Sequence, residues 1–330
     1  MSCIAHRTRT DMPRWAMLVG GIDAGVIGAS LRLLPESLKL AGIPKDDIVA
    51  RRDTSGPIDA FLAERFYPSP GVTHRDEWID GGRLRLRIYT PAPMPSRGVL
   101  YYIHGGGLIL SHVDAYDARC SYWAAHTGCT VVSVDYRLAP ENPYPAAIDD
   151  CITGLLWTHE NLAEFDARSL GVAGDSAGGG LAAATALRNR DVNHLDLACQ
   201  VLIYPMLDDR NTHTDERFAS RLVPWTFEDN SIGWNAYLQG RAGAPDIPAY
   251  AAPARAESLA GLPPTYIDTG SMDIFLDEDV AYAKRLIDDG VPVEAHIWNG
   301  ALHGFDYIAP RIALSRAAWD KRIAFVRSHL

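Results

Sequence analysis

Short apolar runs recur along the chain beyond residue 98, and each is bounded by Gly, Pro or Asp. The runs are rich in β-branched and aromatic residues and cover 99–103, 130–134, 170–173, 199–204, 265–268 and 293–298. Such runs are typical of strands buried on both faces. Helical patterns lie between most of them, at 115–127, 145–160, 177–190 and 277–289, and a last one covers 311–329. This alternation predicts an α/β fold with a mostly parallel central sheet and helices on both faces.

Three regions depart from this rhythm. Residues 1–75 have a helical pattern broken by Pro and Gly, whereas residues 83–89 alternate polar and apolar positions. The alternation predicts a strand with one face in solvent. The interval 206–264 shows little strand pattern and contains Trp225, Phe227, Trp234 and Tyr237. A segment that long inside a compact domain usually has its own structure and a role such as a lid.

Composition narrows the class of protein. The chain has 330 residues, of which 47% are hydrophobic and 22% charged, so it can bury a core without disulfides or metals. A net charge of -10 disfavours nucleic acids and anionic membranes as partners. The five cysteines are odd in number and show no metal-binding spacing. They predict buried free thiols in a reducing compartment.

The N-terminal region resembles neither a secretion signal nor a membrane anchor. Arg7, Arg9 and Arg14 precede an apolar stretch over 15–27 that Asp23 interrupts, and no clear cleavage site follows. The stretch is too short and broken to span a bilayer, so we expect no stable membrane insertion, an amphipathic segment packed on the body of the protein, and a cytoplasmic location. No phosphate loop or dinucleotide fingerprint appears, and we expect neither cofactor nor metal.

The segment 174–178 (GDSAG) fits the G-x-S-x-G pattern. An apolar strand precedes it and a run of helix formers follows it, which is the strand–turn–helix context of a nucleophile elbow. In such a turn the backbone is strained and lifts the serine hydroxyl, while neighbouring backbone crowds the two flanking glycines. The helix that follows directs its first N–H groups at an oxyanion. This context makes Ser176 the candidate nucleophile.

A second glycine motif, 104–107 (HGGG), directly follows the strand at 99–103. Three glycines allow backbone N–H groups to approach a substrate closely, as an oxyanion hole requires. In hydrolases with this fold the oxyanion loop lies upstream of the elbow, where this motif is found. The alternative interpretation of this motif is an ordinary flexible turn. The two motifs together favour an oxyanion loop in an enzyme that catalyses acyl transfer.

A serine nucleophile needs a base and an orienting acid, which follow it in this fold in the order Ser, acid, His. His303 lies in a loop beyond the last strand and is the preferred base. His296 falls within a strand, and His194 and His213 lie in polar surroundings. Asp273 follows the strand at 265–268 and is the preferred acid. Its competitors are Asp268, Asp277 and Asp279. Asp268 lies within the strand. Asp277 and Asp279 lie at a helix start, where a favourable interaction with the helix dipole explains acidic residues without a catalytic role.

The chain resembles the hormone-sensitive-lipase-like branch of the α/β hydrolases, the bacterial carboxylesterases of that group. The resemblance rests on 102–107 (YIHGGG), 135–141 (DYRLAPE), 144–147 (YPAA) and 174–179 (GDSAGG), together with Asp273 and 303–305 (HGF). Leu108 stands where an aromatic residue is common, and Gly180 where asparagine is frequent. For Asp135, Arg137 and Glu141 we expect a structural role, pairing with each other or with backbone.

The resemblance implies a triad of Ser176, Asp273 and His303, and oxyanion N–H donors from Gly105, Gly106 and Ala177. It also implies a cap built from the N-terminal helices and the insertion. The expected organisation is an N-terminal helical cap segment at 1–75, a catalytic domain at 76–205 and 256–330, and a cap insertion at 206–255.

The expected activity is hydrolysis of small-molecule carboxylic esters through an acyl-enzyme. Trp225, Phe227 and Trp234 would favour short to medium acyl chains if they crowd the acyl pocket, but packing of the cap accounts for them equally. The same triad also suits an amidase, formamidase or lactonase. A non-catalytic binding protein on this fold is a further alternative, which the complete triad disfavours. A homodimer formed through cap or edge-strand surfaces is compatible with the sequence.

Overall fold

The computed structural model describes residues 21–40, 43–66, 69–92, 98–211 and 225–330. Eight strands of the described chain form one sheet: β1 (Val72–Ile79), β2 (Leu84–Pro91), β3 (Val99–Ile103), β4 (Thr130–Val134), β5 (Leu170–Asp175), β6 (Cys199–Ile203), β7 (Thr265–Gly270) and β8 (Val293–Trp298). Their spatial order is β1-β2-β4-β3-β5-β6-β7-β8. Pairing is parallel from β4 to β8 and antiparallel at β1–β2 and β2–β4. The expected α/β architecture is confirmed.

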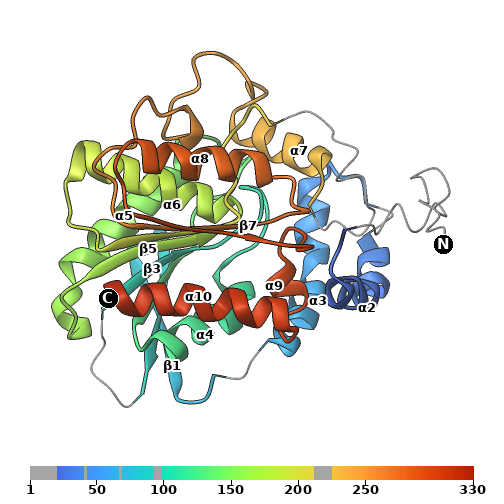
Figure 1. The fold of residues 1–330 in the computed structure, drawn as a ribbon, viewed down its shortest axis with the longest axis horizontal. Helices are drawn as coiled ribbons and strands as arrows, with labels where there is room; N and C mark the ends of the chain where they lie inside the picture. Colours follow the sequence, from blue (N-terminus) through green and yellow to red (C-terminus); the bar gives the residue numbers. More distant parts are fainter. Residues whose placement is uncertain (1–20, 41–42, 67–68, 93–97, 212–224) are drawn as a thin grey trace, which may run out of the picture.

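Helices cover both faces of the sheet (Figure 1). The described helices are α2 (Ala24–Leu40), α3 (Ile48–Arg65), α4 (Asp117–Thr127), α5 (Ala146–Glu160), α6 (Ala177–Arg188), α7 (Phe227–Tyr237), α8 (Leu276–Asp288), α9 (Phe305–Ile308) and α10 (Ala313–His329). Helices α5, α6 and α8 lie on one face, and α4 and α10 on the other. Two hydrophobic clusters result, one on each side of the sheet.

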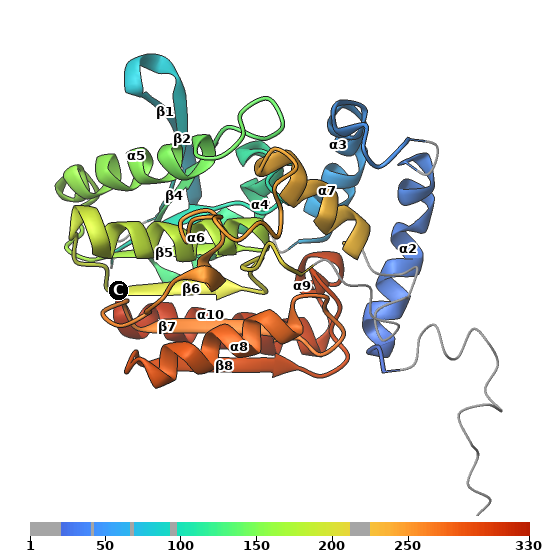
Figure 2. The ribbon, with the colours of Figure 1, turned by 90° about the horizontal axis from the view of Figure 1, so that it is seen from above.

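Helices α2, α3 and α7 stand together at one end of the molecule, beside the carboxyl ends of the parallel strands (Figure 2). Local capping fixes where they start. The Asp23 carboxylate accepts the N–H groups of Gly25 and Val26 at the start of α2. At the start of α7, Thr226 and Asp229 form a reciprocal capping box. None of the helices described is both long and apolar enough to span a lipid bilayer.

The N-terminal boundary and the first hairpin differ from expectation. Residues 72–79 form β1 of the sheet, so the helical part of the N-terminal region ends at Arg65. The polar face of β2 is also not in solvent. Arg87 is buried, with its guanidinium on the carboxylates of Asp76 and Asp117. These ion pairs with β1 and α4 cover the face of β2 that the alternating sequence pattern predicted to be exposed to solvent.

Four of the five cysteines fall within the described residues. Cys120, Cys129, Cys151 and Cys199 are all buried free thiols, as predicted. Burial raises the pKa of Cys120 and Cys151, which disfavours the reactive thiolate. Cys3 lies outside the described residues, as do residues 15–20 of the stretch for which we expect an amphipathic segment.

Gly180 is explained by a close backbone approach. A Cβ atom at this position of α6 would lie 2.0 Å from the carbonyl oxygen of Met206. Any side chain would therefore push α6 away from the segment that follows β6. The departure from asparagine at this position follows from that packing.

We expect Gly180→Ala to lower the free energy of unfolding by about 1–3 kcal/mol, because overpacking a tight site costs that much. The measurement is chemical denaturation followed by tryptophan fluorescence. Gly28→Ala in α2 is the matched control, since nothing lies within 4 Å of a Cβ there. It should be neutral or stabilise by up to about 1 kcal/mol through helix propensity. Equal effects of the two substitutions would contradict the packing explanation.

Candidate active site

Ser176 sits on the turn between β5 and α6 with a φ of 55° and a ψ of -125°. A positive φ is unfavourable for a residue with a side chain, so the surroundings must hold it. The Ser176 N–H donates to the Ile203 carbonyl at 2.9 Å, and its own carbonyl accepts the N–H of Met206 at 2.9 Å. These bonds to the segment at the end of β6 keep the strained turn in place.

The glycines on either side of the turn are required by contact with backbone. A Cβ at Gly174 would lie 2.2 Å from the Gly178 carbonyl oxygen, and one at Gly178 would lie 2.1 Å from the Ile103 carbonyl oxygen. The crowding expected of a nucleophile elbow is therefore present. It brings α6, β5 and the end of β3 into direct backbone contact beneath the serine.

The structure brings Ser176, His303 and Asp273 together. His303 Nε2 lies 2.9 Å from Ser176 Oγ, and His303 Nδ1 lies 2.8 Å from Asp273 Oδ2. With the proton on Nδ1, the imidazole donates to the carboxylate and accepts from the serine hydroxyl. Asp273 is fully buried, and its other oxygen accepts the N–H of Phe275. This is the geometry of a nucleophile, a base and an orienting acid.

Aromatic rings hold the imidazole of His303 on two sides. The ring centroids of Tyr204 and Phe275 lie 4.9 and 5.0 Å from that of His303, both in edge contacts. Only 6% of His303 is exposed. The ring is therefore fixed in orientation by packing as well as by its hydrogen bonds.

The competing residues lie elsewhere. His296 on β8 pairs with Glu294, and His194 is exposed. His213 lies outside the described residues. Asp268 is bound to the guanidinium of Arg322, whereas the preferred acid meets the imidazole directly. The positions of His296, His194 and Asp268 agree with a structural or surface role.

The N–H of Gly105 differs from expectation. It donates to the hydroxyl of Tyr116 at 3.0 Å, on the side of the loop that faces the Asp175 carboxylate. An N–H engaged there is not available to an oxyanion, so this part of the oxyanion prediction is wrong. The sequence carried no signal for it, because Tyr116 lies eleven residues further on in a short 3-10 turn.

The remaining donors of the glycine loop are Gly106 and Gly107. Within the described residues, their N–H groups donate to no backbone carbonyl outside the loop's own turn. Ala177 is the first residue of α6, where an N–H has no acceptor inside the helix. Gly107 also approaches the cap region, because a Cβ there would lie 2.1 Å from the indole of Trp225.

His104 and Tyr136 brace the start of this loop. The His104 Nδ1–H donates to the Gly105 carbonyl at 2.7 Å, and the Tyr136 hydroxyl donates to the His104 carbonyl at 3.0 Å. Their rings stack with centroids 4.3 Å apart. Burial lowers the pKa of His104. The imidazole is therefore a neutral structural group rather than a second base.

The segment 135–141 has the structural role expected of it, with backbone partners as predicted and with charged partners outside the segment. Asp135 binds the Arg85 guanidinium and the Val113 N–H. Arg137 binds Asp150, and Glu141 binds Arg52. These three residues do not pair with each other. They tie the loop to β2, α5 and α3 respectively, which fixes the backbone close to the glycine loop.

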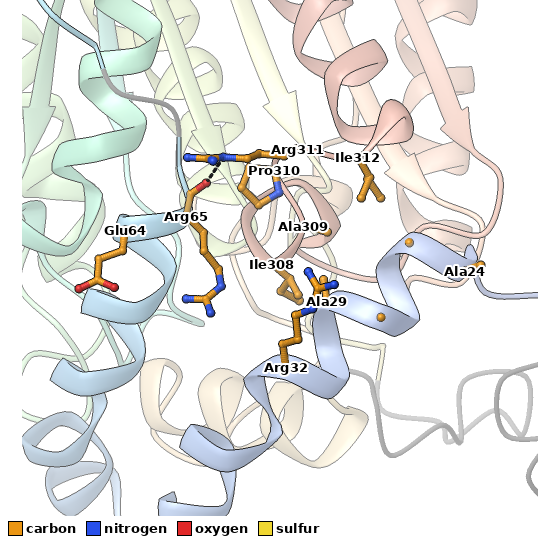
Figure 3. Close-up of a pocket in the computed structure, with 12 residues that line it drawn as sticks. Ala24, Ala29, Arg32, Glu64, Arg65, Ile308, Ala309, Pro310, Arg311 and Ile312 are labelled. Atoms are coloured by element: carbon orange, nitrogen blue, oxygen red, sulfur yellow. Dashed lines mark hydrogen bonds between the residues drawn. The ribbon is translucent and has the colours of Figure 1, made fainter.

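A cavity of about 480 Å³ lies between α2, α3 and the end of α9 (Figure 3). It is lined by Ala24, Gly25, Gly28, Ala29, Arg32, Glu64, Arg65, Ile308, Ala309, Pro310, Arg311 and Ile312. The guanidinium of Arg311 binds the Arg65 carbonyl at its edge. Ser176, His303 and Asp273 do not line it, so it belongs to the junction between the two N-terminal helices and the end of α9.

The fold and this site are those of an α/β hydrolase, and comparisons with known proteins agree. A family model described as alpha/beta hydrolase fold matches residues 100–307. Esterase LipI of Mycobacterium tuberculosis is 35% identical over 260 residues, which cover 76% of this chain and 80% of that protein. Carboxylic ester hydrolase LipN of the same organism is 31% identical over 94% of this chain and 85% of its own.

A solved structure of a bacterial heroin esterase aligns with a TM-score of 0.82 and 33% identity, and covers 94% of this chain and 99% of that one. The chain therefore belongs to the hormone-sensitive-lipase-like family of α/β hydrolases, and it is a carboxylic ester hydrolase.

A second carboxyl group, Asp279, is buried in the first turn of α8, close to Asp273. Burial, followed by the charges of Glu278 and Asp273, raises the pKa of Asp279 well above its usual range. The native carboxyl therefore keeps its proton at a pH where the unfolded chain has lost it. Its contribution to stability is complete below about pH 4 and is lost as the pH rises towards the folded-state pKa.

Asp279→Asn removes this penalty while it keeps the shape of the side chain. We expect the variant to gain stability over wild type as the pH rises above 4, by about 1.4 kcal/mol per pH unit up to the native pKa. Urea unfolding at pH 4.5 and 7.5 measures this. Asp277→Asn, two residues earlier and exposed, should show no pH-dependent gain. An Asp279→Asn effect that is the same at both pH values would refute the argument.

Proposed function

We propose that this esterase hydrolyses small-molecule carboxylic esters with Ser176 as nucleophile, His303 as general base and acid, and Asp273 as the acid that orients the imidazole. One observation carries the proposal: the imidazole lies 2.9 Å from the hydroxyl and 2.8 Å from the carboxylate. Both contacts lie within the reach that proton transfer requires.

In the proposed reaction, His303 Nε2 takes the hydroxyl proton as Ser176 Oγ attacks the ester carbonyl. The tetrahedral intermediate collapses, and the protonated imidazole gives its proton to the leaving alcohol. Water then attacks the acyl-enzyme, with His303 again accepting the proton, and releases the carboxylic acid and free Ser176. The buried Asp273 carboxylate stabilises the imidazolium formed in each half of the reaction.

We propose Gly106, Gly107 and Ala177 as the oxyanion donors. The approach of backbone without side chains at the glycine loop supports this assignment, as does the position of Ala177 at the start of α6. Two or three preorganised N–H groups in a site shielded from water stabilise developing negative charge far better than solvent does.

We also propose that α2, α3 and α7 form the cap. Ion pairs join its two parts, because Lys45, just before α3, and Arg51, in its first turn, bind the Asp229 carboxylate at the start of α7. The Arg52 guanidinium donates to the Ile109 carbonyl at 2.6 Å, which links α3 to the segment after the glycine loop. The N-terminal segment and the insertion then cover the same end of the sheet.

Trp225 supports a preference for short to medium acyl chains. Trp234 is 1% exposed and belongs to the hydrophobic core, which is the packing alternative. Trp225 is buried in the same cluster, but its indole also lies directly against Gly107 of the proposed oxyanion loop. A rigid indole at that place limits the room beside the reacting carbonyl.

The four buried thiols favour the cytoplasm as the proposed location.

Amides, formamides and lactones are the alternative substrates on the same triad. A panel of p-nitrophenyl esters, anilides and lactones of equal acyl size distinguishes these classes, and we propose that esters give the highest kcat/KM.

Ser176→Ala should abolish hydrolysis of p-nitrophenyl butyrate and labelling by a fluorophosphonate probe. Asp273→Asn should keep the fold and lower kcat by about 10⁴, because the amide favours the wrong imidazole tautomer. Stopped assays with purified protein and intact-mass detection of the label measure both. Exposed Asp277→Asn is the matched control. Near wild-type turnover by Ser176→Ala would sink the proposed triad.

Trp225→Ala should raise kcat/KM for decanoate esters relative to butyrate, while wild type should prefer acetate to hexanoate. The control is Trp157→Ala on α5, where the indole packs near Phe165. It removes the same side chain from the catalytic domain and should leave the chain-length profile unchanged. Faster turnover of long-chain than of short-chain esters by wild type is the result that would overturn this preference.

A further inference from the structure

Five charged side chains of alternating sign lie in a row between the sheet and the helices α4 and α10. Arg119 binds Asp175 at 2.7 Å and Asp306 at 2.8 Å. Arg322 binds Asp306 at 2.6 Å and holds Asp268 with two hydrogen bonds of 2.7 and 3.0 Å. All five are at most 3% exposed. We call this row the charge ladder.

Each carboxylate of the charge ladder belongs to a segment that carries a proposed catalytic group. Asp175 directly precedes the nucleophile, and Asp306 follows the catalytic histidine by three residues. Asp268 lies on β7, the strand that leads to the catalytic acid. The two arginines come from α4 and α10, which carry no triad member. Each guanidinium therefore joins two catalytic segments that are far apart in the sequence.

Tyr116 extends the charge ladder to the glycine loop. Its hydroxyl accepts the Gly105 N–H at 3.0 Å and donates to Asp175 Oδ2 at 2.8 Å. The same Oδ2 accepts from Arg119 Nη1. The hydrogen bond that withholds the Gly105 N–H from an oxyanion thus anchors the loop to the ladder.

Tyr204 connects the charge ladder to the catalytic imidazole. Its hydroxyl donates to Asp306 Oδ1 at 2.7 Å and accepts from Arg119 Nη2 at 2.8 Å. Its ring makes the edge contact with His303 described above. Tyr204 has a φ of 34°, a backbone conformation that L-residues rarely adopt. Such strain persists only where the surroundings over-determine it.

A contribution to the stability of the fold does not by itself explain the charge ladder. Burial by itself would raise the pKa of Asp306, but the guanidiniums of Arg322 and Arg119 outweigh it and hold that pKa below its usual range. The charges compensate each other, yet their desolvation cancels much of the gain. Apolar residues of similar volume often hold helices against a sheet equally well. What they lack is directional bonding to three separate carboxylates.

We propose that Arg119 is a positioning residue which, with Arg322, sets the relative placement of the nucleophile elbow, the histidine loop and the acid strand. This role rests on the triad proposed above. The planar guanidinium of Arg119 fixes Asp175, Asp306 and Tyr204 at once. Loss of this bridge lets Ser176 Oγ and His303 Nε2 drift apart. Misplacement by about 1 Å can lower turnover by about 10².

The experiment compares Arg119→Met, which removes the charge at similar length, with Arg119→Lys, which keeps the charge as a single point. The readouts are kcat and KM for p-nitrophenyl butyrate, corrected for the folded fraction taken from unfolding curves. We expect Arg119→Met to lower kcat by about 10² with KM nearly unchanged. Arg119→Lys should restore part of kcat, because an ammonium cannot bridge all three partners.

Two further variants separate positioning from stability. Arg87→Met is the matched control, because Arg87 is a buried arginine that pairs with Asp76, Asp114 and Asp117, and none of these lies on a segment that carries a proposed triad residue. It should lose stability but keep kcat. The double variant Arg119→Met with Asp306→Asn removes adjacent opposite charges. It should recover stability over Arg119→Met while kcat stays low. If Arg119→Met does not fold, the double variant and Arg119→Lys together test the proposal in its place.

A kcat for Arg119→Met or Arg119→Lys equal to that of Arg87→Met would overturn the positioning role, as would recovery of kcat together with stability in the double variant. Failure of the triad itself gives a different result. In that case Ser176→Ala would keep its activity, whereas an inactive Ser176→Ala with fully active Arg119 variants overturns only the charge ladder.

Discussion

The backbone contact beneath Ser176 is the constraint on which the rest of the site depends. Gly178 of α6 rests on the Ile103 carbonyl at the end of β3, at a distance that excludes any Cβ. In the parallel pairing of β3 with β5, Ile103 is opposite Gly174. The glycine loop leaves β3 where the elbow leaves β5, so the register of two strands places the nucleophile beside the proposed oxyanion donors.

The histidine and the acid reach the serine from the other side of the sheet's centre, beyond β6. Among the described residues, no glycine contact of that closeness joins β7 or β8 directly to the elbow. Side chains make the connection instead, through the aromatic contacts of Tyr204 and Phe275 with His303 and through the buried charges below them. One half of the site is thus set by direct backbone contact, whereas in the other half side-chain bonding adds to the pairing of β6, β7 and β8.

This division explains how much the sequence could predict. Ser176, His303 and Asp273, which the structure brings together, could be proposed from the sequence because their signals are local: a strand, a turn and a fixed order along the chain. Gly105 was misassigned because its partner, Tyr116, lies in a turn with no motif. Strand β1 was missed because most of it is exposed and carries no apolar period. The domain boundary predicted at residue 75 consequently falls inside that strand.

The buried arginines were hidden for a different physical reason. A single arginine in an amphipathic helix normally lies on the face that is exposed to solvent. Nothing near Arg119 or Arg322 in the sequence indicates that these two arginines are buried. Their partners lie 56 and 187 residues from Arg119, and 16 and 54 from Arg322. Only the packing of α4 and α10 on the assembled sheet brings such charges together. An ion network of this kind is a property of the tertiary fold, because desolvation makes each charge unfavourable until the others are in place.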